Sequence, residues 1–148
     1  HIRELGSLAM GLEALFGVWK LLSLQFVTSD GAAPQDMYGA DPQGYIFITP
    51  DHRMMTVITA NDRSTTDSEA ALFQSMMAYS GPFRIEGEDQ FITDVEVSWH
   101  PGWVGGEQAR SFSIEADILS ITTAETLHPR FPGQLGRGVL RWQRTSAL

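Results

Sequence analysis

The sequence predicts an all-β fold, an eight-stranded antiparallel up-and-down barrel with one amphipathic helix. The 14 glycines and 7 prolines divide the chain into short segments rich in aromatic and β-branched residues, as the strands of an all-β protein require. About eight such segments follow one another, and that number of sequential strands closes into a barrel with no exposed edge and room for one small ligand.

Three strands are predicted before the helix. Residues 16–27, with the sequence FGVWKLLSLQFV, form the first, and residues 44–49 and 53–60 form a hairpin around the turn 50–52. The intervening residues 28–43 are polar and hold several glycines and prolines. Because this segment is too long for a hairpin loop, it is predicted to form a surface flap.

The helix is predicted at residues 66–80. Thr66 and Glu69 form a capping-box pattern, and the apolar residues that follow recur at helical spacing as far as Tyr79. Gly81 is expected to end this helix, whose apolar face would pack on or across the barrel.

Five more strands are predicted after the helix. They are residues 82–86, 91–99, 107–115, 118–124 and 138–144. Short turns at 87–89 and 116–117 join the first two pairs, and a loop at 125–136, rich in proline and glycine, leads to the last strand.

Composition and charge narrow the function classes. The chain has 148 residues, no cysteine, a net charge of -8 and a pI near 4.8. This length suits one domain with a core of its own. An acidic surface repels phosphate backbones, so nucleic acid is not an expected partner. No segment approaches the roughly 20 apolar residues of a membrane helix, and no signal peptide is recognised, so a cytoplasmic location is expected.

The first residues do not fit the pattern of the rest. Residues 1–9, HIRELGSLA, precede a methionine at Met10. They are interpreted as an expression-tag remnant, with residues 10–148 as the single domain; an authentic N-terminal arm is the alternative.

The head of the first strand carries a family resemblance. Gly17-Val18-Trp19 resembles the G-x-W opening of the calycins, that is, lipocalins and fatty-acid-binding proteins. In those families the tryptophan plugs one end of the barrel and a basic side chain from the last strand covers it. The resemblance gives that place to Arg144 or Arg141.

Longer stretches resemble one family more closely. PQGYI at 42–46, TPDHRM at 49–54 and PGWVGGEQ at 101–108, followed by Arg110-Ser111-Phe112, are similar to the lipocalin-like domain family of small bacterial and fungal proteins. The resemblance extends from residue 16 to 144 and implies a lipocalin-like barrel. It implies no single activity, although several related barrels perform cofactor-free chemistry. Asp94 stands where the family often carries a histidine, so no role of such a histidine is transferred.

Strand alternation selects candidate catalytic residues. In residues 91–100, Glu96 and His100 share a polar face, which lies either in water or in the cavity, where these groups would act as acid or base. Arg110 shares a face with apolar neighbours; it either lies inside, paired with Glu96 or a ligand oxygen, or sits near the barrel mouth. Tyr45 either packs in the core or donates a hydrogen bond to a ligand carbonyl.

Aromatic residues dominate the candidate ligand contacts. Trp99 and Trp103 flank the turn 100–102 at one rim, where they would gate an entrance, stack on a ligand or form a plug. The full set of predicted ligand-binding residues is Trp19, Phe47, Met55, Phe83, Trp99, Trp103, Phe112 and Trp142. The histidines lack metal-ligand spacing, and no nucleophile elbow or phosphate-binding glycine motif is present. Neither a metal nor a cofactor is therefore expected.

Three functions fit these features. The first is a cofactor-free enzyme that isomerises or cyclises a small apolar metabolite, polyketide- or terpenoid-like, in a biosynthetic pathway. Its catalytic groups would be Arg110, Glu96, His100 and Tyr45. The second is a passive carrier of a small hydrophobic ligand. The third is an interaction domain with a filled barrel, a possible homodimer through Leu22, Leu24 and Phe26 if these face outward. A titratable group inside the barrel would favour the enzyme, and a purely apolar open cavity the carrier.

Overall fold

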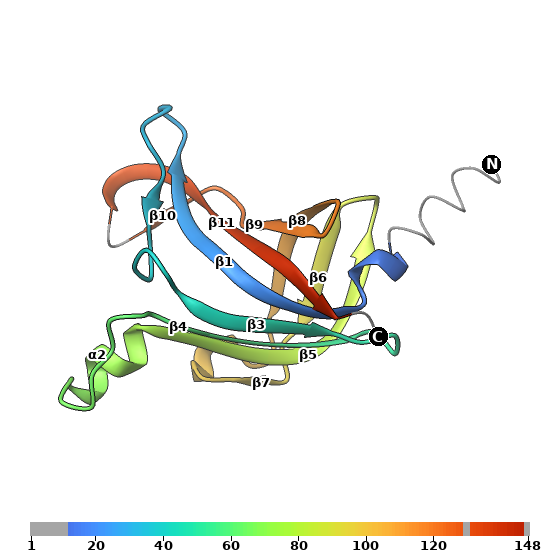
Figure 1. The fold of residues 1–148 in the computed structure, drawn as a ribbon, viewed down its shortest axis with the longest axis horizontal. Coiled ribbons are helices and arrows are strands. Elements are labelled where there is room, and N and C mark those ends of the chain that lie inside the picture. Colours follow the sequence, from blue (N-terminus) through green and yellow to red (C-terminus); the bar gives the residue numbers. More distant parts are fainter. Residues whose placement is uncertain (1–11, 129–130, 147–148) are drawn as a thin grey trace.

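A computed structural model describes residues 12–128 and 131–146, so the predicted tag remnant 1–9 lies outside the described residues. Eight antiparallel strands form a closed barrel in which spatial neighbours are also sequence neighbours, and the last strand pairs with the first (Figure 1). The barrel strands are β1 (Gly17–Thr28), β3 (Gln43–Ile48), β4 (Arg53–Thr59), β5 (Met76–Glu86), β6 (Gln90–Asp94), β8 (Glu107–Glu115), β9 (Ile118–Thr122) and β11 (Phe131–Ser146). Three short strands extend the same sheet: β2 (Gln35–Asp36), β7 (Val97–Ser98) and β10 (Thr126–His128). The predicted fold class is confirmed.

The barrel interior is built from every second residue of each strand. Burial alternates strictly along β3 and β4, where Ile46, Ile48, Met54, Thr56 and Ile58 are buried and their immediate neighbours in these strands are not. Alternation follows from the pleat, which points successive side chains to opposite faces. The core that results also contains Trp19, Leu21, Leu24, Phe83, Phe91, Leu119, Ile121 and Trp142.

The predicted helix at 66–80 is wrong over most of its length. The helix α2 covers only Glu69–Gln74, its N-cap is Ser68 rather than Thr66, and none of its residues is buried. Residues from Met76 onward belong to β5, whose register runs along β4 as far as Pro82. Over a short stretch their apolar residues fit helical and alternating spacing equally well. These residues form a strand because they pair with β4. Gly81 lies inside this strand, where a β-carbon would collide with the backbone carbonyl of Asp94.

Two irregularities reset which face of a strand is buried. In β1 the register shifts between Leu21 and Ser23, so Leu22 points outward at 43% exposed while Leu24 and Phe26 are buried. A bulge adds one residue to one strand and so reverses the alternation beyond it. The expectation that Leu24 and Phe26 could face outward in a dimer is therefore wrong.

The second irregularity divides the predicted strand 91–99. Along β5, Phe83 pairs with Thr93 in β6, whereas Ser80, only three residues earlier, pairs with Val97 in β7. The extra residue on the β6–β7 side forms a bulge at 94–96, and beyond it Val97 turns outward. The alternation assumed across this segment therefore does not hold.

The last strand is longer than predicted. Residues 125–136 are not a single loop, because β10 and the first half of β11 form a hairpin there, with Thr126 paired to Gly136. The phenyl rings of Phe131 and Phe26 stack with their centroids 4.7 Å apart. This hairpin therefore extends the barrel wall beyond the end of β1.

One end of the barrel is closed by its own side chains. Trp19 is fully buried, and its indole N–H donates to the carbonyl of Leu15, in a short helical turn at 12–15. The guanidinium of Arg144 lies 4.1 Å from the Trp19 ring centroid and donates to the carbonyls of Phe16 and Ala14. The covering residue is thus Arg144; Arg141 is exposed.

The barrel end opposite the Trp19 plug carries elements beyond the eight barrel strands. The helical turn before β1 lies at the closed end, whereas α2 and β10 lie at the opposite end (Figure 1). None of the described helices has the length and apolar character that a membrane-spanning helix requires. The open end is therefore where a cavity can meet solvent.

Candidate ligand-binding cavity

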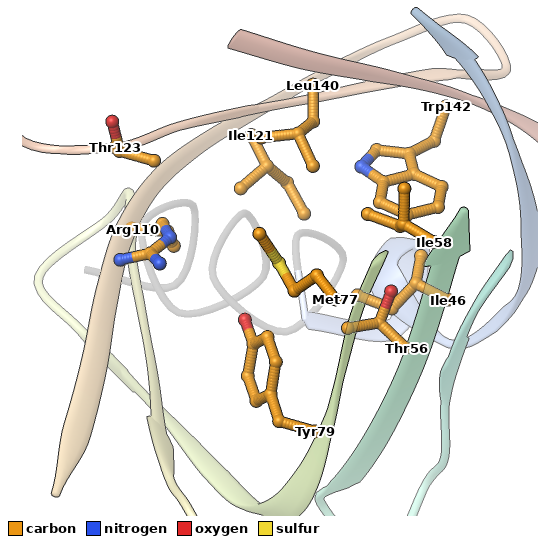
Figure 2. Close-up of a pocket in the computed structure, with 10 residues that line it drawn as sticks. All are labelled: Ile46, Thr56, Ile58, Met77, Tyr79, Arg110, Ile121, Thr123, Leu140 and Trp142. Carbon is orange, nitrogen blue, oxygen red and sulfur yellow. The ribbon is translucent and has the colours of Figure 1, made fainter. Parts of the chain in front are cut away.

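The barrel contains a cavity that reaches its open end. Its outer part has a volume of about 380 Å³, and an inner pocket of about 40 Å³ lies deeper in the barrel. Met77, Arg110, Thr123 and Leu140 line both parts, which therefore adjoin (Figure 2). A volume of this size is in the range of natural small-molecule sites.

The cavity wall is mostly apolar. The outer part is lined by Leu24, Phe26, Met37, Tyr38, Met77, Trp103, Arg110, Thr123, Ala124, Thr126, Gly138 and Leu140. The inner pocket adds Ile46, Thr56, Ile58, Tyr79, Ile121 and Trp142. These described lining residues include no aspartate, glutamate or histidine, so the wall offers a ligand mainly van der Waals contact, with Arg110 as its charged group.

Arg110 reaches the cavity from the regular strand β8. Gln108, Arg110, Phe112 and Ile114 alternate with the outward-facing residues, and Arg110 is half-buried. Its guanidinium donates to the side-chain oxygen of Gln108 at 2.8 Å and to the carbonyl of Ala109 at 2.9 Å. No carboxylate in the described part of the chain forms an ion pair with it. Among the residues that the structure describes, this cation of the cavity is thus held by neutral groups of its own strand.

Tyr79 is the second polar group of the cavity. Burial disfavours the charged phenolate and raises the pKa of the Tyr79 hydroxyl, although the positive charge of Arg110 opposes this shift. The hydroxyl therefore stays protonated at neutral pH and can donate a hydrogen bond. The ring of Tyr79 contacts that of Trp103 edge-on, with centroids 5.3 Å apart. Figure 2 shows the Tyr79 hydroxyl and the Arg110 guanidinium extending into the same cavity.

Trp142 supplies a donor to the inner pocket. Its indole N–H and the hydroxyl of Thr93 are buried without a hydrogen-bond partner in the part of the chain that the structure describes. In Figure 2 the indole nitrogen lies on the ring edge that faces the cavity. The inner pocket is large enough for one water molecule or one polar ligand atom, either of which would satisfy this donor.

Several predicted site residues face away from the cavity. Tyr45, Phe47 and Met55 lie on the outer face of the barrel, 45%, 48% and 55% exposed. The expected inward orientation of Tyr45 is wrong because its neighbours Gly44 and Ile46 occupy the inner face of β3. Phe47 and Met55 are a cross-strand pair on that same outer face.

The two predicted acid–base groups also lie outside. Glu96 is exposed at the bulge and pairs with Arg53, not with Arg110. His100 is exposed and accepts a hydrogen bond from the backbone N–H of Gly102 at 3.0 Å, where it caps the short helix η1 (Pro101–Trp103). Of the two alternatives for this polar face, the one in water is therefore the observed one. Glu96 continues the alternation in which Thr93 and Val95 are buried, and the residues after the bulge leave the barrel wall.

The predicted tryptophans fall into different environments. Trp103 and Trp142 line the cavity, whereas Trp19 is the plug of the closed end. Trp99 lies behind Trp103, with ring centroids 4.9 Å apart, and donates its indole N–H to the carbonyl of Phe73 in α2. It therefore holds α2 against the rim and does not line the cavity.

The other two predicted phenylalanines, Phe83 and Phe112, lie in or against the core. Phe83 stacks on Phe91 with centroids 4.5 Å apart, and Phe112 is half-buried with its ring edge toward Phe91. Neither is among the residues that line the cavity.

Sequence reasoning missed several lining residues. Met77 and Tyr79 were assigned to the helix, although Met77, Tyr79, Gly81 and Phe83 form an alternating series that signals a strand. Thr123 and Leu140 carry no local signal, since strand pairing brings them to the cavity: Thr123 follows β9, which pairs with β8 beside Arg110, and Leu140 lies on β11, which pairs with β9.

A match over nearly the whole described chain shows its family. The model of a lipocalin-like domain family matches residues 16–145. A 4'-hydroxy-3'-methoxypropiophenone carrier protein of Aspergillus oryzae is 33% identical over 94 residues, which is 57% of this chain and 82% of that protein. Among solved structures, a redesigned β-barrel covers 92% of this chain at 14% identity with a TM-score of 0.44. A de novo designed fluorescence-activating β-barrel covers 91% at 10% identity, also with a TM-score of 0.44.

Proposed function

We propose that this chain, which belongs to the lipocalin-like domain family, is a carrier that encloses one small, largely apolar molecule and releases it unchanged. The observation that carries this proposal is the cavity of about 380 Å³ at the open end of the barrel, with its mostly apolar lining. Burial of a ligand's apolar surface there would supply most of the binding free energy.

The lining also bears on the choice between carrier and enzyme. Proton transfer needs an acid or base within hydrogen-bond reach of the reacting atom. Glu96 and His100, the groups proposed for that task, are exposed on the outside. Arg110 and the neutral Tyr79 can donate hydrogen bonds to an oxygen, but neither is suited to remove a proton at neutral pH. This supports binding over isomerisation or cyclisation.

The relative from Aspergillus oryzae supports the same choice. Its name makes it a carrier of an aryl ketone with a phenol group. We extend to this chain the general ligand class, an aromatic or similarly flat molecule with few oxygen atoms. Trp103, Phe26 and Tyr38 at the mouth are suited to contact such a molecule through their rings.

The test is calorimetric titration with 4'-hydroxy-3'-methoxypropiophenone and with unsubstituted propiophenone. We expect saturable one-to-one binding with a dissociation constant of about micromolar strength. Leu140→Trp, which fills the cavity, should weaken binding at least about tenfold. Leu22→Trp, which adds the same side chain on the outer face, should leave it unchanged.

A second measurement separates the carrier from the enzyme. The ligand is incubated with the protein in heavy water, extracted and examined by NMR. A carrier returns it unchanged, without isotope exchange above the buffer rate. A new isomer or catalysed exchange would overturn the carrier in favour of the enzyme, and absence of any binding would overturn both.

A further inference from the structure

The half-buried arginines differ in how their charge is balanced. Arg84 pairs with the carboxylates of Glu86, Asp94 and Glu107, and Arg144 stacks on Trp19 and donates to backbone carbonyls. Arg63 donates to the hydroxyl of Ser75 and to the carbonyl of Leu72 in the last turn of α2. Each of these three side chains thus serves a contact between separate segments.

Arg110 serves no such contact. Its hydrogen bonds go to the adjacent residue Ala109 and to Gln108 two residues away. Both partners lie in β8, so these bonds connect Arg110 to no other described element. An arginine placed for stability alone would be expected to bridge elements or to reach solvent fully. Arg110 instead lies in the wall shared by both parts of the cavity.

A charge in such a wall is costly unless it is paired. A half-buried guanidinium loses part of its hydration, and only a charged partner with good geometry repays this. The described wall supplies no carboxylate, but the cavity has room beside Arg110 for an anion from outside. Since the chain carries a net charge of -8, long-range attraction does not draw anions to it. Preference for an anion would therefore have to arise from short-range pairing at Arg110.

We infer that the ligand carries an ionised oxygen acid, a carboxylate, phenolate or enolate, which pairs with Arg110 while its apolar body fills the cavity. This deepens the proposed carrier function and rests on it. The hydroxyl of Tyr79, which lines the inner pocket beside Arg110, supplies a neutral donor to the same oxygen group. Charge-assisted hydrogen bonds of this kind are about twice as strong as neutral ones.

The test uses two probes of nearly equal shape, 2-naphthoate and 2-naphthamide, which differ in charge. Dissociation constants are measured by calorimetry at one pH and one ionic strength. We expect the wild-type protein to bind 2-naphthoate about tenfold or more tightly than 2-naphthamide, which corresponds to one charge-assisted pair. Arg110→Met should reduce this preference to about one while 2-naphthamide still binds.

The matched control is Arg141→Met, which removes the same charge from the outer face of β11 and should keep the preference. Arg110→Gln repeats the test with a polar side chain in case the methionine variant does not fold, and circular dichroism checks both. A third probe, 4-nitrophenol, reports the pKa of a bound phenol by its absorbance. This pKa should fall by about one unit in the wild type, equal to a tenfold preference for the phenolate, and not in Arg110→Gln.

The outcomes separate the two proposals. Equal or stronger binding of 2-naphthamide by the wild type overturns the anion inference and leaves the carrier proposal standing. Retention of the preference in both Arg110 variants also overturns it. If neither naphthalene probe nor either propiophenone binds, the carrier proposal fails and the anion inference fails with it.

Discussion

The two ends of the barrel each contain an inward-directed arginine, and their surroundings are opposite. At the closed end Arg144 lies on the face of Trp19, donates to the carbonyls of Phe16 and Ala14, and lies 3.5 Å from the carboxylate of Asp117. At the cavity, the hydrogen bonds of Arg110 within the described residues go to neighbours in its own strand. Arg144 thus connects β11 with β1, with the segment 14–16 and with the turn 116–117. The hydrogen bonds of Arg110 connect β8 with no other described segment.

This difference separates stability from binding within one small fold. A donor whose partners are all internal contributes to the free energy of unfolding and has nothing left for a ligand. A donor with incomplete internal partners costs stability and retains its capacity for an external group. The contrast predicts opposite responses to substitution at the two ends.

The largest expected effect is at the plug. Trp19→Ala should lower the free energy of unfolding by about 3–5 kcal/mol, because it removes a fully buried aromatic side chain and leaves a cavity. Trp103→Ala at the open end should cost clearly less, since Trp103 is half-buried and already borders open space. Urea unfolding of both variants measures the difference, and equal losses would refute the division into a stabilising and a binding end.

The paired arginine substitutions come next. Arg144→Met should destabilise the protein by about 2 kcal/mol, because the half-buried carbonyls of Ala14 and Phe16 lose their donor. Arg110→Met should be neutral or stabilising by about 1 kcal/mol, because it replaces an unpaired half-buried charge by an apolar side chain. The comparison fails if the two variants shift the urea midpoint in the same direction by the same amount.

A smaller effect on stability is expected in alkaline solution, where Tyr79 titrates. Burial raises the pKa of Tyr79 above its ordinary value of about 10, so above that pH the unfolded chain releases a proton that the folded chain retains. The contribution of Tyr79 is therefore fully present below about pH 10 and is lost as the pH rises through the pKa of the folded state. Tyr79→Phe should show a shallower decline of stability above pH 10, measured by urea unfolding across pH 7–11. Parallel curves for the two proteins would contradict this.

The smallest effect separates the two buried indoles. Trp19→Phe breaks the hydrogen bond to the carbonyl of Leu15, whereas Trp142→Phe removes an N–H that has no partner among residues 12–128 and 131–146. Both variants lose similar volume, so Trp142→Phe should be less destabilising by about 1 kcal/mol. Thermal unfolding under identical conditions gives the difference, and a larger loss for Trp142→Phe would show that its N–H is satisfied in solution.

The strands and their order were predictable because turn residues and apolar segments mark them locally. The helix was overextended because Met76, Met77 and Tyr79 satisfy two periods at once, and only the pairing with β4 decides between them. The sequence of β3 was equally ambiguous, since Tyr45 and Phe47 on one face are as apolar as Ile46 and Ile48 on the other.

The site was less predictable than the fold for a specific physical reason. Arg110 lies on a strand without irregularities, so simple alternation places it correctly relative to Phe112. Glu96 and His100 belong to a polar face, and alternation alone does not say whether that face lies inside or outside. The bulge at 94–96 turns Val97 outward and ends the regular alternation in this segment. A bulge leaves no mark in residue type, because it arises from how two strands meet.

The pairing of β1 with β11 also has a consequence during protein synthesis. Of the barrel strands, β1 is synthesised before all the others and its free edge is covered when β11 pairs with it, over a register from Val18 with Ser146 to Thr28 with Gly136. Pairing between such distant segments forms slowly, because the chain loses the entropy of loop closure before the contacts between the strands stabilise it. Until β11 arrives, the nascent sheet is open, its apolar inner face is accessible to chaperones, and no enclosed cavity exists. A ligand therefore cannot guide the early steps of folding and can stabilise only the completed chain.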